Sequence, residues 1–197
     1  MKSANLRPFL LLAIFMALIV AVSNYLVQFP FNFFGLEQFL TFGAFSYPIT
    51  FLITDLCNRK YGKILSRKVV YVGFISGISL TLFFSTNFND LISLRIAFGS
   101  GIAFLAAQLL DIQVFDRLRK NIWFLAPFAS STIGSIVDTF LFFSISFYGT
   151  NLNWATLALG DLSVKILMAV LMLIPFRMLM NILQDTAHKY SRGTSSA

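Results

Sequence analysis

The sequence predicts an all-α membrane protein with six transmembrane helices and both termini in the cytoplasm. Hydrophobic residues make up 57% of its 197 residues and charged residues only 12%, whereas an ordinary soluble domain carries about 25% charged residues. The mean hydropathy is +0.79. The apolar residues gather in six runs, and the basic residues lie almost entirely in alternate links between these runs. Length, composition and charge pattern therefore agree on one polytopic fold class.

Each apolar run has about the length of a membrane crossing, for which about 20 apolar residues are needed. Six runs leave room only for short links, so we expect a single transmembrane domain over residues 1–190 in contact with the lipid bilayer. The polar stretch 191–197 is expected to be a disordered tail. The runs cover residues 8–27, 39–56, 69–86, 92–114, 122–147 and 154–180.

The first two runs carry special features. Lys2, Arg7 and the sequence Ala21-Val22-Ser23 imitate a cleavable signal peptide, but we expect the first helix to be retained. The second run is the shortest and contains Tyr47-Pro48. Because proline removes a backbone donor, the helix is expected to bend or break there. Such a break either forms part of a functional site or is a simple kink in the helix.

The later runs also show packing and interface signals. Gly73 and Gly77 form a GxxxG face on the third run, which suits either a homodimer contact or packing within one chain. Trp123 and Trp154 begin the fifth and sixth runs, where indoles favour the membrane interface.

The basic residues set the expected orientation. Thirteen of the 15 Lys and Arg precede the first run, lie at the end of the sixth run or beyond it, or lie in the second-to-third and fourth-to-fifth links. All four segments fall on one side if there are six crossings, and the positive-inside rule makes that side cytoplasmic. We therefore predict a multi-pass protein of the inner (plasma) membrane. The net charge of +7 is explained by this topology, so nucleic-acid binding is not expected.

Charged residues inside the apolar runs predict a polar site between the helices. Each costs about 2.5–3.5 kcal/mol in the bilayer centre unless it faces protein or water. Asp161 and Lys165 have the i, i+4 spacing of an ion pair on one helix, serving either structure or the exchange of a proton or substrate. Ser131, Ser135 and Asp138 share one face of the fifth helix. We expect Asp138 to belong to the site.

A second polar group is expected near the inner ends of the second and fourth helices. Alternatively, Asp55 bridges to the basic link, and Gly62 ends the helix as a left-handed cap. Asn24 lies near the outer end of the first helix and carries an amide suited to recognising a heterocycle edge or to bridging helices. The group consists of Thr50, Thr54, Asp55, Asn58, Gln108 and Asp111.

Catalytic and metal-binding patterns are not found in the sequence. One His and one Cys exclude the common zinc sites. The HExxH, GxSxG and phosphate-binding glycine motifs do not occur. We expect no enzyme, no metal and no cofactor.

The segment YPITFLITDLCNRKYG, residues 47–62, resembles the queuosine precursor transporter family of the vitamin uptake transporters. Members typically carry P-x-T-F-L-x-T-D-x-x-N-x-x-Y-G at this place. The resemblance extends to Gln108–Asp111, to residues 131–138 and to Asp161 with Lys165. The family usually has an acidic residue near Asn58, where this chain has Arg59, so no role is carried onto that position.

The resemblance implies uptake of small deazapurine bases, the 7-cyano and 7-aminomethyl 7-deazaguanines used in tRNA modification. Asp138 or Asp161 would accept the N–H groups of the base, Asn24 or Gln108 would pair with its acceptor, and Tyr47 would stack on its ring. Alternatives are a substrate-binding membrane subunit of a larger energy-coupled importer and a structural protein of the membrane. The expected substrate-binding residues are Asn24, Tyr47, Thr50, Asp55, Asn58, Gln108, Asp111, Ser131, Ser135, Asp138, Asp161 and Lys165.

Overall fold

The computed structural model describes residues 6–33, 35, 37, 40–84 and 88–181. Their regular structure is helical, apart from one isolated bridge between Pro30 and Thr41. A turn at Met172 ends the last named helix, and residues 173–181 are helical again. The expected tail, 191–197, and the domain limit at residue 190 lie outside the described residues. The helices are α1 (Leu6–Leu26), α2 (Gly43–Ser46), α3 (Pro48–Tyr61), α4 (Lys63–Phe84), α5 (Leu91–Leu118), α6 (Leu125–Phe147) and α7 (Trp154–Leu171).

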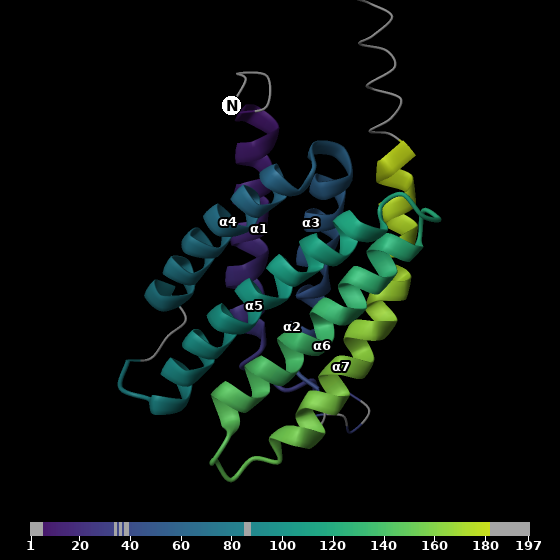
Figure 1. Ribbon diagram of the computed structural model, residues 1–197. Coiled ribbons are helices and arrows are strands. Elements are labelled where there is room, and N and C mark those ends of the chain that lie inside the picture. Colours follow the sequence, from purple (N-terminus) through teal and green to yellow (C-terminus); the bar gives the residue numbers. More distant parts are fainter. Residues whose placement is uncertain (1–5, 34, 36, 38–39, 85–87, 182–197) are drawn as a thin grey trace, which may run out of the picture.

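The helices pass up and down through the molecule in sequence order (Figure 1). The start of α1, the α3–α4 junction, the α5–α6 link and the end of the helical segment after α7 all lie at the upper end of this view. Among the residues described, five helices are long and apolar enough to cross a membrane: Phe9–Leu26, Lys63–Phe84, Leu91–Leu118, Leu125–Phe147 and Trp154–Asn181. The all-α polytopic fold class is thus confirmed, whereas the cytoplasmic position of both termini stays a prediction.

The second crossing is interrupted at the expected place. Helices of 4 and 14 residues, α2 and α3, are separated by Tyr47 alone, and Pro48 is the first residue of α3. Proline is favoured at the first helical position, because that position has no intrahelical N–H bond to lose. Neither piece alone reaches the length of a membrane crossing. The second predicted span is therefore a broken helix, and six unbroken crossings are not present in the part of the chain that the structure describes.

Helix α4 begins six residues before the predicted start at residue 69, so the basic segment is helix and not a link. Only Gly62 separates α3 from α4, at φ 81° and ψ 171°. Glycine alone readily adopts this region. Gly62 therefore ends α3 with the positive φ expected of a glycine cap, but its ψ differs from the value of about +47° of the left-handed helical conformation. Lys and Arg are good helix formers, so the low hydropathy of this basic segment did not mean that the segment lies outside a helix. In contrast, α6 begins at Leu125, three residues after the predicted start at residue 122. Trp123 therefore lies in the link before this helix and not at its beginning.

The GxxxG face of α4 packs inside the chain against α1. A Cβ at Gly73 would lie 2.5 Å from Met16 Cγ, and one at Gly77 would lie 2.9 Å from Val20 Cβ. Of the two uses expected for this face, the structure shows packing within one chain. The homodimer stays a prediction and loses this motif as its support.

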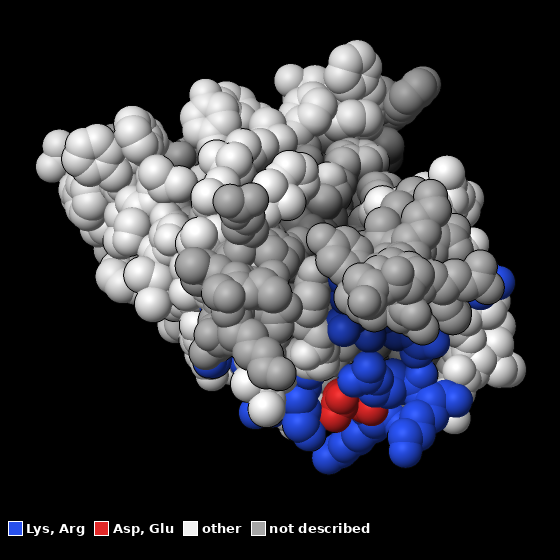
Figure 2. Space-filling model, turned by 90° about the horizontal axis from the view of Figure 1, so that it is seen from above, with Lys and Arg blue, Asp and Glu red and all other residues white. Residues whose placement is uncertain are grey.

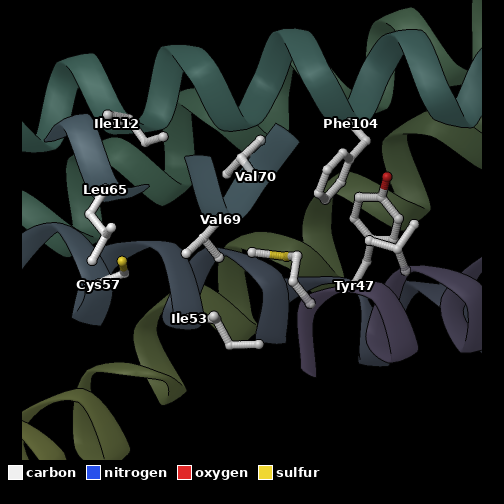
Figure 3. Packing of buried hydrophobic residues seen from close by; sticks show 10 residues of the cluster. Tyr47, Ile53, Cys57, Leu65, Val69, Val70, Phe104 and Ile112 are labelled. Atoms are coloured by element: carbon white, nitrogen blue, oxygen red, sulfur yellow. The ribbon is translucent and has the colours of Figure 1, made fainter. Parts of the chain in front are cut away.

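An apolar core lies where α3, α4 and α5 meet. Val69 and Val70 of α4 are fully buried between Ile53 of α3 and Ile112 of α5 (Figure 3). Tyr47 and Phe104 close the core at the level of the helix break, with ring centroids 6.1 Å apart. The core fixes α3 against α5 and so positions the polar side chains on their remaining faces.

Candidate functional site

Buried polar side chains form two separate groups between the helices. The first, called here the ion-pair site, consists of Asp138 and Thr139 of α6 with Asp161 and Lys165 of α7. The second, called here the acid pair, consists of Asp55 of α3 and Asp111 of α5. The carboxylates and Lys165 are between 0% and 4% exposed.

In the ion-pair site, one lysine neutralises two carboxylates only in part. Lys165 Nζ lies 2.6 Å from Asp161 Oδ2 and 2.8 Å from Asp138 Oδ2. Thr139 accepts a hydrogen bond from Lys165 at 3.2 Å and donates one to Asp161 at 2.8 Å. The expected Asp161–Lys165 pair is present, and Asp138 joins it from the neighbouring helix. With all three groups ionised, the site carries a net charge of −1.

The break in the second crossing lies against this site. Lys165 Nζ is 5.2 Å from the centroid of the Tyr47 ring, a distance at which a cation is attracted to the face of an aromatic ring. The residue between α2 and α3 thereby contacts the charge carried by α7. Movement at the break would change the surroundings of Lys165.

A narrow pocket with a cavity volume of about 20 Å³ opens beside the ion-pair site. Asp138 Oδ1 has no hydrogen-bond partner among the described residues. It is therefore available to accept an N–H from a ligand. Asn24 also lines the pocket and donates its side-chain N–H to Thr81 at 3.1 Å. The lining residues are Ser23, Asn24, Val27, Gly43, Tyr47, Ser100, Asp138, Phe142, Asp161 and Lys165.

The acid pair brings two carboxyl groups into direct interaction. Asp55 accepts hydrogen bonds from the hydroxyls of Ser130 at 3.1 Å and Ser131 at 3.3 Å. Neither oxygen of Asp111 has a hydrogen-bond partner in the described part of the chain. The expectation that Asp55 bridges to the basic link is wrong, because hydroxyls of α6 hold it inside the bundle.

Gln108 connects the polar face of α3 to α5. Its amide donates to Thr50 Oγ1 at 2.8 Å and accepts from Thr54 Oγ1 at 2.5 Å. Thr50 in turn donates to the backbone oxygen of Tyr47 at 2.7 Å. Asn58 reaches α5 one turn further on, where it donates to the backbone oxygen of Ile112 at 3.0 Å. Because both sides of its amide are occupied, Gln108 holds these helices together.

The predicted site residues divide between these groups and do not form a single site. Thr139 and Ser130 were missed, because Ser and Thr in apolar runs often bond only to their own helix. Ser135 is buried on α6 between the two groups. The pocket receives Asn24, Tyr47, Asp138, Asp161 and Lys165, and the neighbourhood of the acid pair receives Thr50, Asp55, Asn58, Gln108, Asp111 and Ser131.

Basic side chains gather at the end of the molecule where the α3–α4 junction and the α5–α6 link meet (Figure 2). Arg59 donates to the backbone oxygen of Arg119 at 2.5 Å, and Arg119 donates back to that of Arg59 at 3.2 Å. Asp116 lies 3.2 Å from Lys63 and 3.4 Å from Arg119. The two links that we expect in the cytoplasm are thus braced against each other.

The apolar helices enclose a charged pocket, and this arrangement is that of a polytopic membrane transporter. The profile of the family described as "Putative vitamin uptake transporter" matches residues 41–180, and the chain belongs to this family. Since this is a family of transporters, the protein is not an enzyme. It is a multi-pass protein of the inner membrane.

Three curated relatives carry related names. The "Queuosine precursor transporter" of Escherichia coli (strain K12) is 34% identical over 192 residues, which cover 87% of this chain and 86% of the relative. A "Probable queuosine precursor transporter" of Haemophilus influenzae is 34% identical over 86% of this chain and 84% of its own. One of Bacillus subtilis is 31% identical over 59% of each. No solved structure gives a significant match.

Proposed function

We propose that this protein imports queuosine precursors, the 7-cyano and 7-aminomethyl 7-deazaguanines, for tRNA modification. The names of its relatives support this substrate class. The observation that carries the proposal is the buried Asp138 Oδ1, which lines the pocket without a hydrogen-bond partner among the described residues. A heterocycle with N–H groups on its edge supplies the donor that this oxygen lacks.

The pocket offers complementary groups for the rest of such a base. Tyr47 and Phe142 present aromatic rings for its flat face, and Asn24 lines the same pocket with a side-chain amide. Gln108 is less suited to contact the base, since Thr50 and Thr54 occupy its amide. The cavity has a volume of about 20 Å³ in this conformation, which admits a water molecule but not a base. Binding would therefore require the surrounding helices to move apart.

The net charge of the ion-pair site suits both members of this substrate class. Lys165 already bonds to Asp138 and Asp161, so the site retains one negative charge for a ligand. A protonated aminomethyl group compensates that charge, and a cyano-substituted base still donates its ring N–H groups. Alternating access would follow from movement of α2 and α3 about Tyr47.

Uptake of labelled 7-cyano-7-deazaguanine into liposomes that contain only the purified protein tests the proposal. We expect saturable uptake by the wild-type protein and a loss of at least about tenfold in Asp138→Asn, because the amide replaces an acceptor oxygen by a donor. Asp90→Asn is the matched control, since Asp90 caps α5 and asparagine caps equally well.

The outcomes separate the proposed carrier from its alternatives. Saturable binding without uptake would indicate a binding subunit that needs a separate energy-coupling module. Neither binding nor uptake would indicate a different substrate or a structural role. Full transport by Asp138→Asn would remove Asp138 from the binding site.

A further inference from the structure

We propose that the acid pair, Asp55 with Asp111, is a proton-binding site separate from the substrate pocket. One proton shared between the two carboxyl groups would be the coupling ion of the carrier. The inference rests on the proposed transport function and adds its driving force. Neither residue lines the pocket beside Lys165.

The first observation is the direct approach of two buried carboxyl groups. Asp55 is 1% exposed and Asp111 is 0% exposed. Two neighbouring carboxylates in a low-dielectric interior repel each other and lack hydration, which strongly disfavours the doubly ionised state. One shared proton removes one charge and makes a hydrogen bond between the two groups.

The second observation is an unpartnered polar oxygen beside the pair. Asn58 is fully buried, and its Oδ1 has no hydrogen-bond partner among the described residues. Its amide N–H reaches the backbone oxygen of Ile112, the residue after Asp111. The Asn58 side chain therefore points at α5 beside the pair, where its oxygen adds an acceptor for a proton or a small cation.

The other polar groups that face the pair are uncharged. Helix α6 presents the hydroxyls of Ser130 and Ser131 to Asp55. Helix α4 places Ser66 beside the thiol of Cys57, on the α3 turn that also carries Asp55. The helical segment after α7 packs the apolar Phe176 near this end of α3.

The nearby charged groups have partners elsewhere. Arg59 and Arg119 bond to each other's backbone oxygens, and Lys63 pairs with Asp116. Lys165 bonds to the two carboxylates of the ion-pair site. A proton is therefore the simplest positive charge for the acid pair to bind.

A set of hydrogen bonds connects the residue next to Asp55 in α3 to the pocket. Thr54, which precedes Asp55, donates to Gln108, and Gln108 donates to Thr50. Thr50 donates to the backbone of Tyr47, which lines the pocket. Protonation changes the charge where α3 contacts α5 and α6. A ligand that favours one arrangement of this contact shifts the arrangement at Tyr47 as well.

The test compares substrate accumulation with substrate exchange in liposomes of the purified protein. With one proton per substrate molecule, a gradient of one pH unit supports about tenfold accumulation of a neutral substrate, since each factor of ten equals about 1.4 kcal/mol. The membrane potential is clamped at zero, and 7-cyano-7-deazaguanine is the substrate. We expect the wild-type protein to concentrate the substrate and to acidify the lumen as it does so.

The variant Asp111→Asn carries a neutral isostere of the protonated acid. We expect it to equilibrate the substrate without concentrating it, and Asp55→Asn to behave likewise. Asp116→Asn is the matched control, because Asp116 is a partly exposed acid in the basic cluster, and it should accumulate substrate as the wild type does. Accumulation driven by a sodium gradient, or gradient-driven accumulation by Asp111→Asn, would overturn the proposal.

An infrared measurement tests the site without transport. The wild-type protein in detergent at neutral pH should show the carbonyl absorption of a buried protonated carboxyl group, and Asp111→Asn should lose it. Absence of this band in the wild type would overturn the proton site. Absence of wild-type exchange, with the band present, would overturn the proposed substrate and leave the proton site standing.

Discussion

Gly134 of α6 lies directly against the ring of Phe51 in α3. A Cβ at residue 134 would be 2.6 Å from Phe51 Cε1, and Phe51 is 2% exposed. This contact brings α3 near enough to α6 for Ser130 and Ser131 to bond to Asp55. The glycine therefore sets the spacing on which the acid pair depends.

Gly134→Ala should separate α3 from α6 and destabilise the protein by about 1–3 kcal/mol, the usual effect of an overpacked core. Thermal unfolding in detergent measures the effect as a lower Tm. The double variant Gly134→Ala with Phe51→Leu should recover part of the loss, because leucine lacks the ring atom that clashes. An equal Tm in Gly134→Ala and the wild type would contradict the close contact.

Lys165→Met should destabilise the protein severely. It leaves Asp138 and Asp161 buried without their cation, and removing one partner of a buried ion pair costs about 3–5 kcal/mol. Size-exclusion chromatography and thermal unfolding should show aggregation or a much lower Tm. Lys68→Met, at an exposed position of α4, is the control and should behave as the wild type.

The ion-pair site shows which features could be predicted from the sequence. Burial of Asp138, Asp161 and Lys165 was predictable, because the cost of a charge in a membrane depends on one residue and its apolar neighbours. The Asp161–Lys165 pair was also predictable from spacing on one helix. The bond between Asp138 and Lys165 was not, because it depends on the relative rotation of α6 and α7, which periodicity within each run does not fix.

Gly62→Ala should weaken the α3–α4 junction. The backbone there, at φ 81° and ψ 171°, strains any residue with a Cβ by about 1–3 kcal/mol. The expected result is a lower Tm, with Ser163→Ala, an exposed residue of α7, as the control. A Tm that Gly62→Ala leaves unchanged would indicate that this junction readily adopts another backbone conformation.

The orientation in the membrane can be tested by cysteine labelling, because the native Cys57 is buried and gives little background. A membrane-impermeant maleimide should label Asn153→Cys in intact cells, since residue 153 lies in the α6–α7 link. Lys120→Cys, in the basic α5–α6 link, should react only after the membrane is permeabilised. The reverse pattern would place the basic face outside.

The second crossing shows why patterns within one stretch of sequence predicted only part of the structure. Tyr47-Pro48 marked the break correctly, because the chemistry of proline is local. The partners of Asp55 and Asp111 were missed, because they come from α6 and from the approach of α3 to α5. The basic residues after Gly62 looked like a link, although their side chains suit the end of a helix that reaches water.

The division of the ion-pair site between α6 and α7 has a consequence for biogenesis. Asp138 enters the bilayer on α6, whereas its cation arrives later on α7, which already carries its own counter-ion, Asp161. A helix with an unpaired carboxylate near its centre inserts poorly by itself. The short stretch between Phe147 and Trp154 allows the two helices to leave the translocation machinery as a hairpin with the charges already paired. Correct insertion of α6 then depends on completed synthesis of α7.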